Sequence, residues 1–181
     1  MSDQELITRI LDGNKNAFRD MIKRYEYLVA ATVYGMLGKC PEAEDVGQET
    51  FIRFYNGLKN FRGESSVSSY LTRIAINLSL NELKRRKRRS QVFHKQDEAH
   101  FELPDQHQHN IYDDQNELVQ SALKALKPKF RSVIVLRLID GYSTQETAQI
   151  LKIPVGTVLS RLARAQKKLK EILLPVIGET V

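Results

Sequence analysis

The residues with the clearest chemistry lie near the C-terminus, in residues 143–174. Hydroxyl and basic side chains recur there at spacings that share one side of a helix: Thr157, Ser160, Arg161, Arg164, Lys167 and Lys168. Hydroxyls can bond base edges or phosphates, arginine can fork onto guanine, and lysine suits phosphates. The other side carries apolar residues at steps of four and three, which predicts a buried stripe: Val158, Leu162, Ala165, Leu169 and Ile172.

A short capped helix is predicted just before this basic helix. Ser143 and Glu146 form a capping-box pattern, and Ile153-Pro154 interrupts the helix that they begin. A short helix, a tight turn and a longer basic helix are typical of a DNA-binding helix-turn-helix. The alternative is an amphipathic hairpin with a solvated basic face. That alternative explains the stripe but not the clustered hydroxyl and arginine side chains.

A second polar face is predicted in the first half of the chain. Its members share one side of a helix that follows a Ser- and Gly-containing loop: Tyr70, Arg73, Asn77, Asn81 and Lys84, with Phe61 and Arg62 in the loop. Aromatic platforms, amides and cations set close together suit single-stranded DNA. Each residue alone also has a structural explanation, such as Tyr70 in the core or a basic run at a helix C-terminus. The residues alone leave both interpretations open.

The elements that must position these side chains are predicted to be helices, because apolar residues recur every three or four positions. In the first half we expect four helices: one from a Ser2–Glu5 capping box to Gly13, one over 18–37, one from Pro41 to about Gly57, and one after the turn at 62–66. In the second half we expect helices over 118–126 and 130–138, the capped helix, and the basic helix from Val155 to Leu174, stopped by Pro175. No strand pattern is present, so the sequence predicts an all-α fold.

Charge divides the chain into unequal parts. Residues 1–83 carry −1, residues 84–89 carry +6, residues 90–117 carry −6 and residues 118–181 carry +7. Asymmetry of this kind indicates two modules and favours a nucleic-acid partner, although a solvated charged surface is an equal alternative on charge alone. Polar residues 90–116 predict a flexible acidic linker between two small helical domains, 1–89 and 117–181. The linker holds His94, His100, His107 and His109, but their spacing matches no zinc template.

Several classes of protein are not favoured. The longest apolar run, Leu28 to Leu37, is too short to span a bilayer and is broken by Thr32 and Gly35, and the acidic N-terminus is unlike a secretory signal. A single cysteine, Cys40, excludes an intramolecular disulfide and a cysteine zinc site. No metal-binding carboxylate cluster, phosphate-binding loop or nucleophile–base pattern stands out, so we expect no catalytic residues, metal or cofactor. We expect a soluble cytoplasmic protein without direct membrane insertion.

Four motifs make the pattern more specific. Residues 43–51 (AEDVGQETF), 61–65 (FRGES) and 70–77 (YLTRIAIN) resemble region 2 of the extracytoplasmic-function (ECF) sigma factors. Residues 154–165 (PVGTVLSRLARA) resemble the region 4 recognition helix of that family. The resemblance covers almost the whole chain in order. It implies a sigma factor that brings RNA polymerase to promoters, melts DNA and starts transcription.

The resemblance also implies roles for matching residues. One helix would dock on the clamp helices of the polymerase β′ subunit, through Asp45, Gln48, Glu49, Phe51 and Arg53. A second set would read the −10 element and trap a flipped base: Phe61, Arg62, Ser65, Ser66, Tyr70, Arg73, Asn77 and Asn81. A third set would face the −35 duplex: Thr157, Ser160, Arg161, Ala163, Arg164, Lys167 and Lys168.

The partners that the resemblance implies are core RNA polymerase (β′ clamp helices and β flap), promoter DNA and an anti-sigma factor. The chain departs from the family's pattern at Tyr70, where tryptophan is frequent, at Asn81, where aspartate is frequent, and at Leu159, where a basic residue is frequent. The departures at Asn81 and Leu159 concern promoter specificity. The competing hypothesis is a free-standing helix-turn-helix regulator that acts without polymerase. Such a regulator should show a sensor pocket or a dimeric DNA-reading pattern, and neither is evident.

Overall fold

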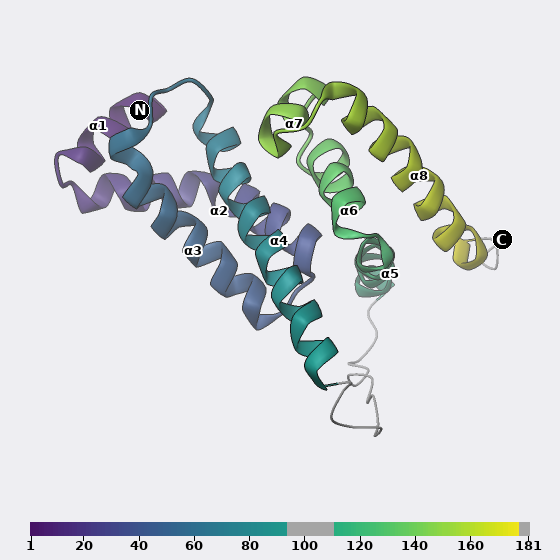
Figure 1. The fold of residues 1–181 in the computed structure, drawn as a ribbon. Coiled ribbons are helices and arrows are strands. Elements are labelled where there is room, and N and C mark those ends of the chain that lie inside the picture. The colour runs from purple at the N-terminus through teal and green to yellow at the C-terminus, as the bar shows by residue number, and fades with distance from the viewer. Residues whose placement is uncertain (94–110, 178–181) are drawn as a thin grey trace.

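The computed structural model describes the backbone of residues 1–93 and 111–177 (Figure 1). The first half contains α1 (Asp3–Leu11), α2 (Lys15–Leu37), α3 (Pro41–Gly57), the short 3₁₀ helix η1 (Leu58–Asn60) and α4 (Val67–Phe93). The second half contains α5 (Ile111–Ala125), α6 (Pro128–Ile134), the π-helical turn η2 (Val135–Ile139), α7 (Thr144–Leu151) and α8 (Val155–Ile177). The described residues include no strand, and the all-α prediction is confirmed.

The predicted start signals of α1 and α3 lie where expected, and α2 begins at a cap that was not predicted. Ser2 and Glu5 exchange both hydrogen bonds of a capping box at the start of α1. Asn14 caps α2 through its side-chain oxygen, and Pro41 occupies the first turn of α3, where its missing N–H leaves no helical bond unmade. Gly38 ends α2 with a φ of 76°, in the left-handed region that favours glycine. Local sequence chemistry therefore sets most of the helix ends.

Two expectations at helix ends need correction. Pro175 does not stop the last helix, because α8 continues to Ile177. A proline in the last turn removes only one backbone hydrogen bond of the helix, so a short continuation is tolerated. Helix also reaches into both ends of the segment expected to be a linker, since α4 extends to Phe93 and α5 begins at Ile111. Residues 94–110, which hold the four histidines, lie outside the described residues.

The two halves pack against each other in the described structure. In the second half, α5, α6 and η2 contact α2, and α6 and α7 contact α4, whereas α8 packs on the far side of α6 and α7 (Figure 1). Four residues of the second half belong to the same core cluster as α1–α4: Val135, Leu136, Tyr142 and Ile150. A second, smaller core holds α5, α6 and α8 together around Leu123, Leu126, Ile134 and Ala165. The helices that carry the two predicted DNA-binding faces are therefore parts of one packed structure.

Candidate nucleic-acid interface

The helix-turn-helix is built by α7 and α8. At the start of α7, the Ser143 hydroxyl accepts the Glu146 N–H at 3.2 Å, and Glu146 accepts the Ser143 N–H at 2.8 Å. These bonds from Ser143 hold the pKa of Glu146 below its ordinary value. Lys152 ends α7 in the left-handed conformation, with a φ of 52°, which turns the chain into α8. Ala148 and Val158 then pack together across the turn, as the predicted helix-turn-helix requires.

The two sides of α8 differ as the sequence predicts. Val158 and Ala165 are fully buried, and Leu162, Leu169 and Ile172 are half-buried. On the predicted DNA side five residues are exposed and two are half-buried; the exposed ones are Ser160, Ala163, Arg164, Lys167 and Lys168, and the others are Thr157 and Arg161. The Ser160 hydroxyl donates to the Thr157 carbonyl at 3.1 Å, so its oxygen can still accept a hydrogen bond from a base. The structure thus places all seven residues on one helix, five of them open to solvent.

The predicted −10 face begins with an aromatic cluster. The Tyr70 ring lies 5.2 Å from the Phe61 ring and 5.9 Å from the Phe54 ring, and Tyr70 and Phe61 are both half-buried. A Cβ added at Gly57 would lie 2.6 Å from the Tyr70 hydroxyl, so only glycine leaves room for this ring at its present place. Tyr70 is therefore both packed and partly open. This is a suitable state for a ring that stacks on a base.

The other residues of this face lie along the loop and α4. Arg62, Asn77 and Asn81 are exposed, and Ser65 and Arg73 are half-buried. Ser66 also has a structural role, because its hydroxyl accepts a hydrogen bond from the Ser69 N–H at 3.1 Å in the first turn of α4. The structure brings the loop, the aromatic cluster and the amides together along one helix.

The predicted polymerase-docking residues are divided by burial. Asp45, Gln48 and Arg53 are exposed on α3, and Glu49 is half-buried and pairs with Arg53 at 2.7 Å. The Phe51 side chain is only 9% exposed and belongs to the core. The expectation that Phe51 lies on the docking surface therefore needs correction. It packs inward and holds the helix, because it falls on the same side of α3 as Phe54.

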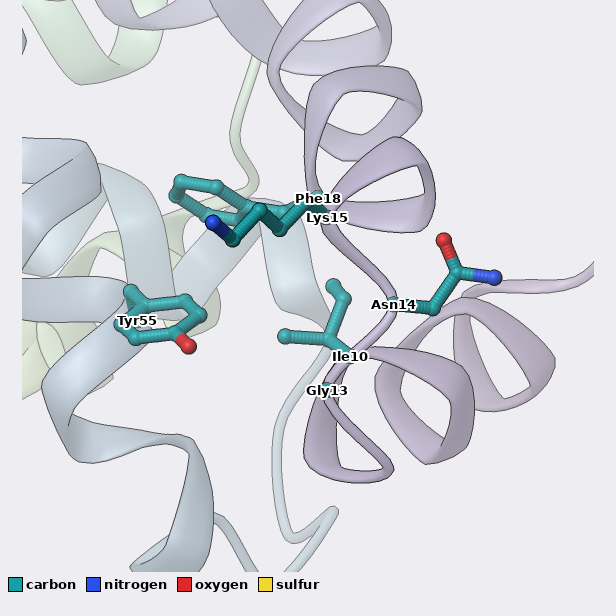
Figure 2. Close-up of a pocket in the computed structure, with 6 residues that line it drawn as sticks. All are labelled: Ile10, Gly13, Asn14, Lys15, Phe18 and Tyr55. Carbon is teal, nitrogen blue, oxygen red and sulfur yellow. The ribbon is translucent and has the colours of Figure 1, made fainter.

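Two exposed residues of α3 were missed by the sequence reading. Ile52 is 53% exposed and Tyr55 is 47% exposed, and both belong to the outward side of the helix. Tyr55 packs on Phe18 with ring centroids 4.9 Å apart, and both line a pocket of about 310 Å³ between the end of α1, the start of α2 and the end of α3 (Figure 2). The signal that could have identified them is that Ile52 and Tyr55 are large apolar side chains on the outward side of the helix, where polar residues are expected.

A second pocket, of about 350 Å³, lies between α3 and α4. Its lining includes acidic residues from both helices: Glu42, Asp45, Glu49 and Glu82. Asn81 from the −10 set also lines it. Two of the predicted functional sets therefore meet at one groove of negative character. Near its rim, Arg86 bridges Glu82 at 3.1 Å, Glu42 at 3.4 Å and the Cys40 sulfur at 3.1 Å, which fixes α4 to the start of α3.

Among the described residues, none of the helices combines the length and the apolar character that a membrane span needs. The described residues also contain no group of three or more His, Cys, Asp and Glu side chains that could hold a metal ion. The four histidines at positions 94, 100, 107 and 109 lie outside the described residues.

Comparison with known proteins gives consistent results for both halves. Residues 21–89 match the Sigma-70 region 2 family, and residues 116–169 match the Sigma-70 region 4 family. The RNA polymerase sigma-H factor of Pseudomonas aeruginosa is 33% identical, with 98% of this chain and 96% of the relative covered. The ECF RNA polymerase sigma-E factor of Escherichia coli K12 is 34% identical, with 98% and 97% covered.

Two solved structures share the arrangement of the chain. CnrH, in complex with the cytosolic domain of CnrY, matches with a TM-score of 0.71 at 26% identity, covering 94% of this chain and 96% of CnrH. The sigma factor RpoE of Bartonella quintana, in complex with the anti-sigma factor NepR, matches with a TM-score of 0.68 at 25% identity, covering 86% and 96%. Both family matches, the full-length relatives and the resembling motifs agree. This chain belongs to the sigma-70 family of RNA polymerase sigma factors, in its ECF group.

Proposed function

We propose that this ECF sigma factor reads the −35 element with α8, reads the −10 element with α4 and its preceding loop, and docks on core RNA polymerase through α3. One observation carries the proposal: each of these three helices presents to solvent the side chains that its motif requires. Of the implied residues, only Phe51 is buried in the core. We assign residues 1–89 and 117–181 to the two modules and residues 90–116 to the segment between them.

The −35 assignment rests on the chemistry of α8. Arg164 is exposed beside Ala163, and the small side chain of Ala163 leaves room for the helix to enter a major groove. Arginine can donate two hydrogen bonds to guanine, whereas Lys167 and Lys168 farther along suit phosphates. The helix therefore carries one side chain that can recognise a base, Arg164, and two lysines that can bind phosphates and position the helix.

The −10 assignment rests on the aromatic cluster. Tyr70 is held by Phe54 and Phe61, so its ring can stack on an unpaired base without losing much conformational freedom. The Asn77 amide can pair with a base edge, because it carries both donors and an acceptor and lies exposed on the next turns of α4. The Arg62 guanidinium in the loop is exposed and suits a phosphate.

The polymerase assignment rests on α3. Asp45, Gln48 and Glu49 form a polar edge beside the exposed Ile52 and Tyr55. An acidic edge with apolar neighbours fits a basic helical partner, such as the β′ clamp helices, and the β flap is the expected partner of the second half. We further propose an anti-sigma factor as an inhibitory partner, since the Bartonella RpoE structure is a complex with one.

We also propose that the protein acts in the cytoplasm, where polymerase and promoters are, and that it catalyses no reaction of its own. Sigma factors are not enzymes in the catalytic sense. Its contribution is to bind and to position DNA for the polymerase.

The decisive test is transcription from genomic DNA fragments by purified core polymerase, with and without this protein. We expect new start sites that share sequence elements near −35 and −10. If core polymerase neither binds the protein nor starts at new sites, the proposal fails and a free-standing helix-turn-helix regulator replaces it. That regulator would bind specific duplex DNA without polymerase, so a binding assay on the isolated protein distinguishes the two.

A further inference from the structure

Two large apolar side chains lie open to solvent near the start of α8. Val155 is 42% exposed and Leu159 is 52% exposed. Among the described residues, the hydrophobic clusters of the second half include Val158, Leu162 and Leu169 from this helix but neither member of the pair. Much of any protein surface is apolar, so exposure alone gives the pair no role. Its position on the helix is what indicates one.

Helical geometry places the pair along one edge of the predicted DNA-reading face. Residues four apart lie one above the other on a helix, so Val155, Leu159 and Ala163 form a continuous apolar edge. Successive residues are about 100° apart around the axis, which puts Ser160 in the middle of the outward side and Arg164 beyond it. The face is therefore divided into an apolar edge and an edge with hydroxyl and basic groups.

The apolar edge has one apolar group to meet in the major groove of DNA. That group is the 5-methyl group of thymine, because the other exposed groups of the bases there donate or accept hydrogen bonds. An apolar side chain against those polar groups would remove their water without replacing its hydrogen bonds. The first turns of a recognition helix contact the base edges, and Leu159 lies in the second turn of α8. Leu159 therefore suits thymine better than any other base.

The length of the apolar edge fits neighbouring base pairs. Val155 and Leu159 are four residues apart, which is about 6 Å along the helix axis. Stacked base pairs are about 3.4 Å apart. The two side chains can therefore reach methyl groups on base pairs that are one or two steps apart.

A protein partner is the other kind of molecule that could cover this apolar pair. DNA is favoured because Leu159 adjoins Ser160 and Ala163, which are both exposed and both belong to the predicted −35 residues. A side chain in this place enters the groove whenever the helix reads a duplex. The same turns of α8 cannot contact a protein and the bases at the same time.

We propose that Leu159, supported by Val155, makes this chain selective for thymine in the −35 element through contact with the 5-methyl group. The proposal rests on the proposed function, since it requires α8 to read that element, and it adds a specificity-determining residue and the base that it selects. Arg164 on the opposite edge can bond guanine. Leucine contributes selectivity without charge, whereas a lysine at position 159 would attract the phosphates of every sequence.

Replacing thymine with uracil tests the contact, because uracil lacks only the 5-methyl group. The probe is a promoter duplex obtained by mapping start sites, synthesised with thymine or with uracil in its −35 element. Binding is measured with holoenzyme reconstituted from core polymerase and the full-length protein. The test variant is Leu159→Ala. The matched control is Leu174→Ala, because Leu174 is 55% exposed on the same helix but lies beyond the predicted −35 residues.

We expect the unsubstituted holoenzyme to bind the thymine duplex about fourfold more tightly than the uracil duplex for each methyl group contacted, as the burial of about one methyl group predicts. Leu159→Ala should remove most of this preference, and Leu174→Ala should keep it. Equal affinity of the unsubstituted holoenzyme for the two duplexes overturns the proposal. So does a full thymine preference in Leu159→Ala, or a −35 element that contains no thymine.

Two further substitutions separate apolar contact from charge. Leu159→Met keeps an apolar side chain of similar volume, so it should keep the thymine preference. Leu159→Lys should lose the preference and make binding to both duplexes more dependent on salt, because it adds a phosphate contact. If Leu159→Lys keeps the preference that Leu159→Met loses, apolar contact is not its cause and the proposal fails.

Two controls identify what has failed if the preference is absent. Binding to core polymerase without DNA tests the protein alternative: a loss there with Leu159→Ala, together with an equal loss on both duplexes, assigns Leu159 to a protein contact and overturns the proposal. A duplex with a scrambled −35 element tests the proposed function. If the unsubstituted holoenzyme binds it as tightly as the intact duplex, −35 reading by α8 fails, and the thymine contact with it. If binding depends on the −35 element but not on its methyl groups, only the thymine contact fails.

Discussion

Arg164 is the residue for which base reading and phosphate binding can be separated most directly. It is exposed on α8 next to the small Ala163, whereas Lys167 is exposed one turn later. If Arg164 reads a base, Arg164→Ala should cost about 1–3 kcal/mol of discrimination between promoter and random DNA. Lys167→Ala should weaken both equally. Binding by the polymerase holoenzyme to matched and mutated −35 duplexes measures this, and equal losses for Arg164→Ala would assign it to phosphate binding.

Gly57 is important because it leaves room for the Tyr70 side chain. The Tyr70 ring is confined by Phe54 and Phe61, so it cannot easily yield to a methyl group placed 2.6 Å from its hydroxyl. We expect Gly57→Ala to lower the free energy of unfolding by roughly 1–3 kcal/mol, the usual cost of overpacking. It should also impair promoter melting, because the ring would move.

Tyr70→Phe provides the matched rescue, since it removes the crowded hydroxyl and keeps the ring. Adding Tyr70→Phe to Gly57→Ala should restore most of the lost stability in urea denaturation. If Gly57→Ala is equally destabilising with tyrosine or phenylalanine at position 70, the close approach is not the cause.

At the scale of elements, α7 depends on its capping box. The helix has only 8 residues, and its first turn is held by the exchange between Ser143 and Glu146. Ser143→Ala should cost about 0.5–2 kcal/mol of stability. The bonds that lower the pKa of Glu146 contribute above the unfolded pKa and are lost as pH falls through the folded one, so the cost should shrink in acid.

The capping box at Ser2 is a natural control for this prediction. It has the same residues and geometry but begins α1, which packs on α2 and η1. Ser2→Ala should therefore reduce stability by a similar amount without changing the use of the −35 element, whereas Ser143→Ala should reduce both. Urea denaturation and initiation from promoters with intact or altered −35 elements provide the two readouts. If the two variants reduce the use of the −35 element equally, α7 has no specific role in −35 recognition.

The elements were largely predictable because their signals are local. Apolar spacing predicted the stripe on α8, and side-chain oxygens and prolines marked where helices begin. The π-helical turn at Val135–Ile139 was not predicted, because nothing in its residue types differs from an ordinary helix. Phe51 lies three residues before Phe54, so helical spacing alone places both on the buried side of α3, whereas the family motif suggested a surface role for Phe51. Periodicity gave the better prediction of its place.

At the scale of the whole molecule, the sequence suggested two modules and missed their contact. Thr32 and Gly35 looked like interruptions in an apolar run, but both are buried where the second half packs. A Cβ added at Gly35 would lie 2.9 Å from a methyl carbon of Val135, a hundred residues later in the chain, so the close packing there needs this pair. The Thr32 hydroxyl donates a hydrogen bond to Asp140 at 2.9 Å. Neither pairing has a periodic signal. Long-range complementarity between single residues is therefore the part of this fold that sequence reading could not supply.

Asp140 makes the packing between the two halves sensitive to pH. Burial raises the pKa of its carboxyl to about 6, although the bond from Thr32 opposes the shift. An acid whose folded pKa is raised contributes stability that is fully present below its unfolded pKa, near 4, and is lost as pH rises through about 6. The packing of the second half on α2 should therefore weaken between about pH 4 and pH 6, by at most about 3 kcal/mol. Nearby Tyr142 also has a raised pKa, so it does not titrate in this range.

Asp140→Asn isolates this effect from the four histidines, which also titrate near neutral pH. The amide keeps a partner for Thr32 but cannot ionise, so the variant should not lose stability as pH rises from 4 to 7. Urea denaturation at a series of pH values across this range measures the free energy of unfolding of both proteins. The unsubstituted protein should lose up to about 3 kcal/mol more than the variant over this range. If both proteins show the same pH dependence, ionisation of Asp140 does not weaken the packing of the two halves. If only the variant lacks the dependence, ionisation of the half-buried Asp140 carboxyl is what weakens this packing near neutral pH.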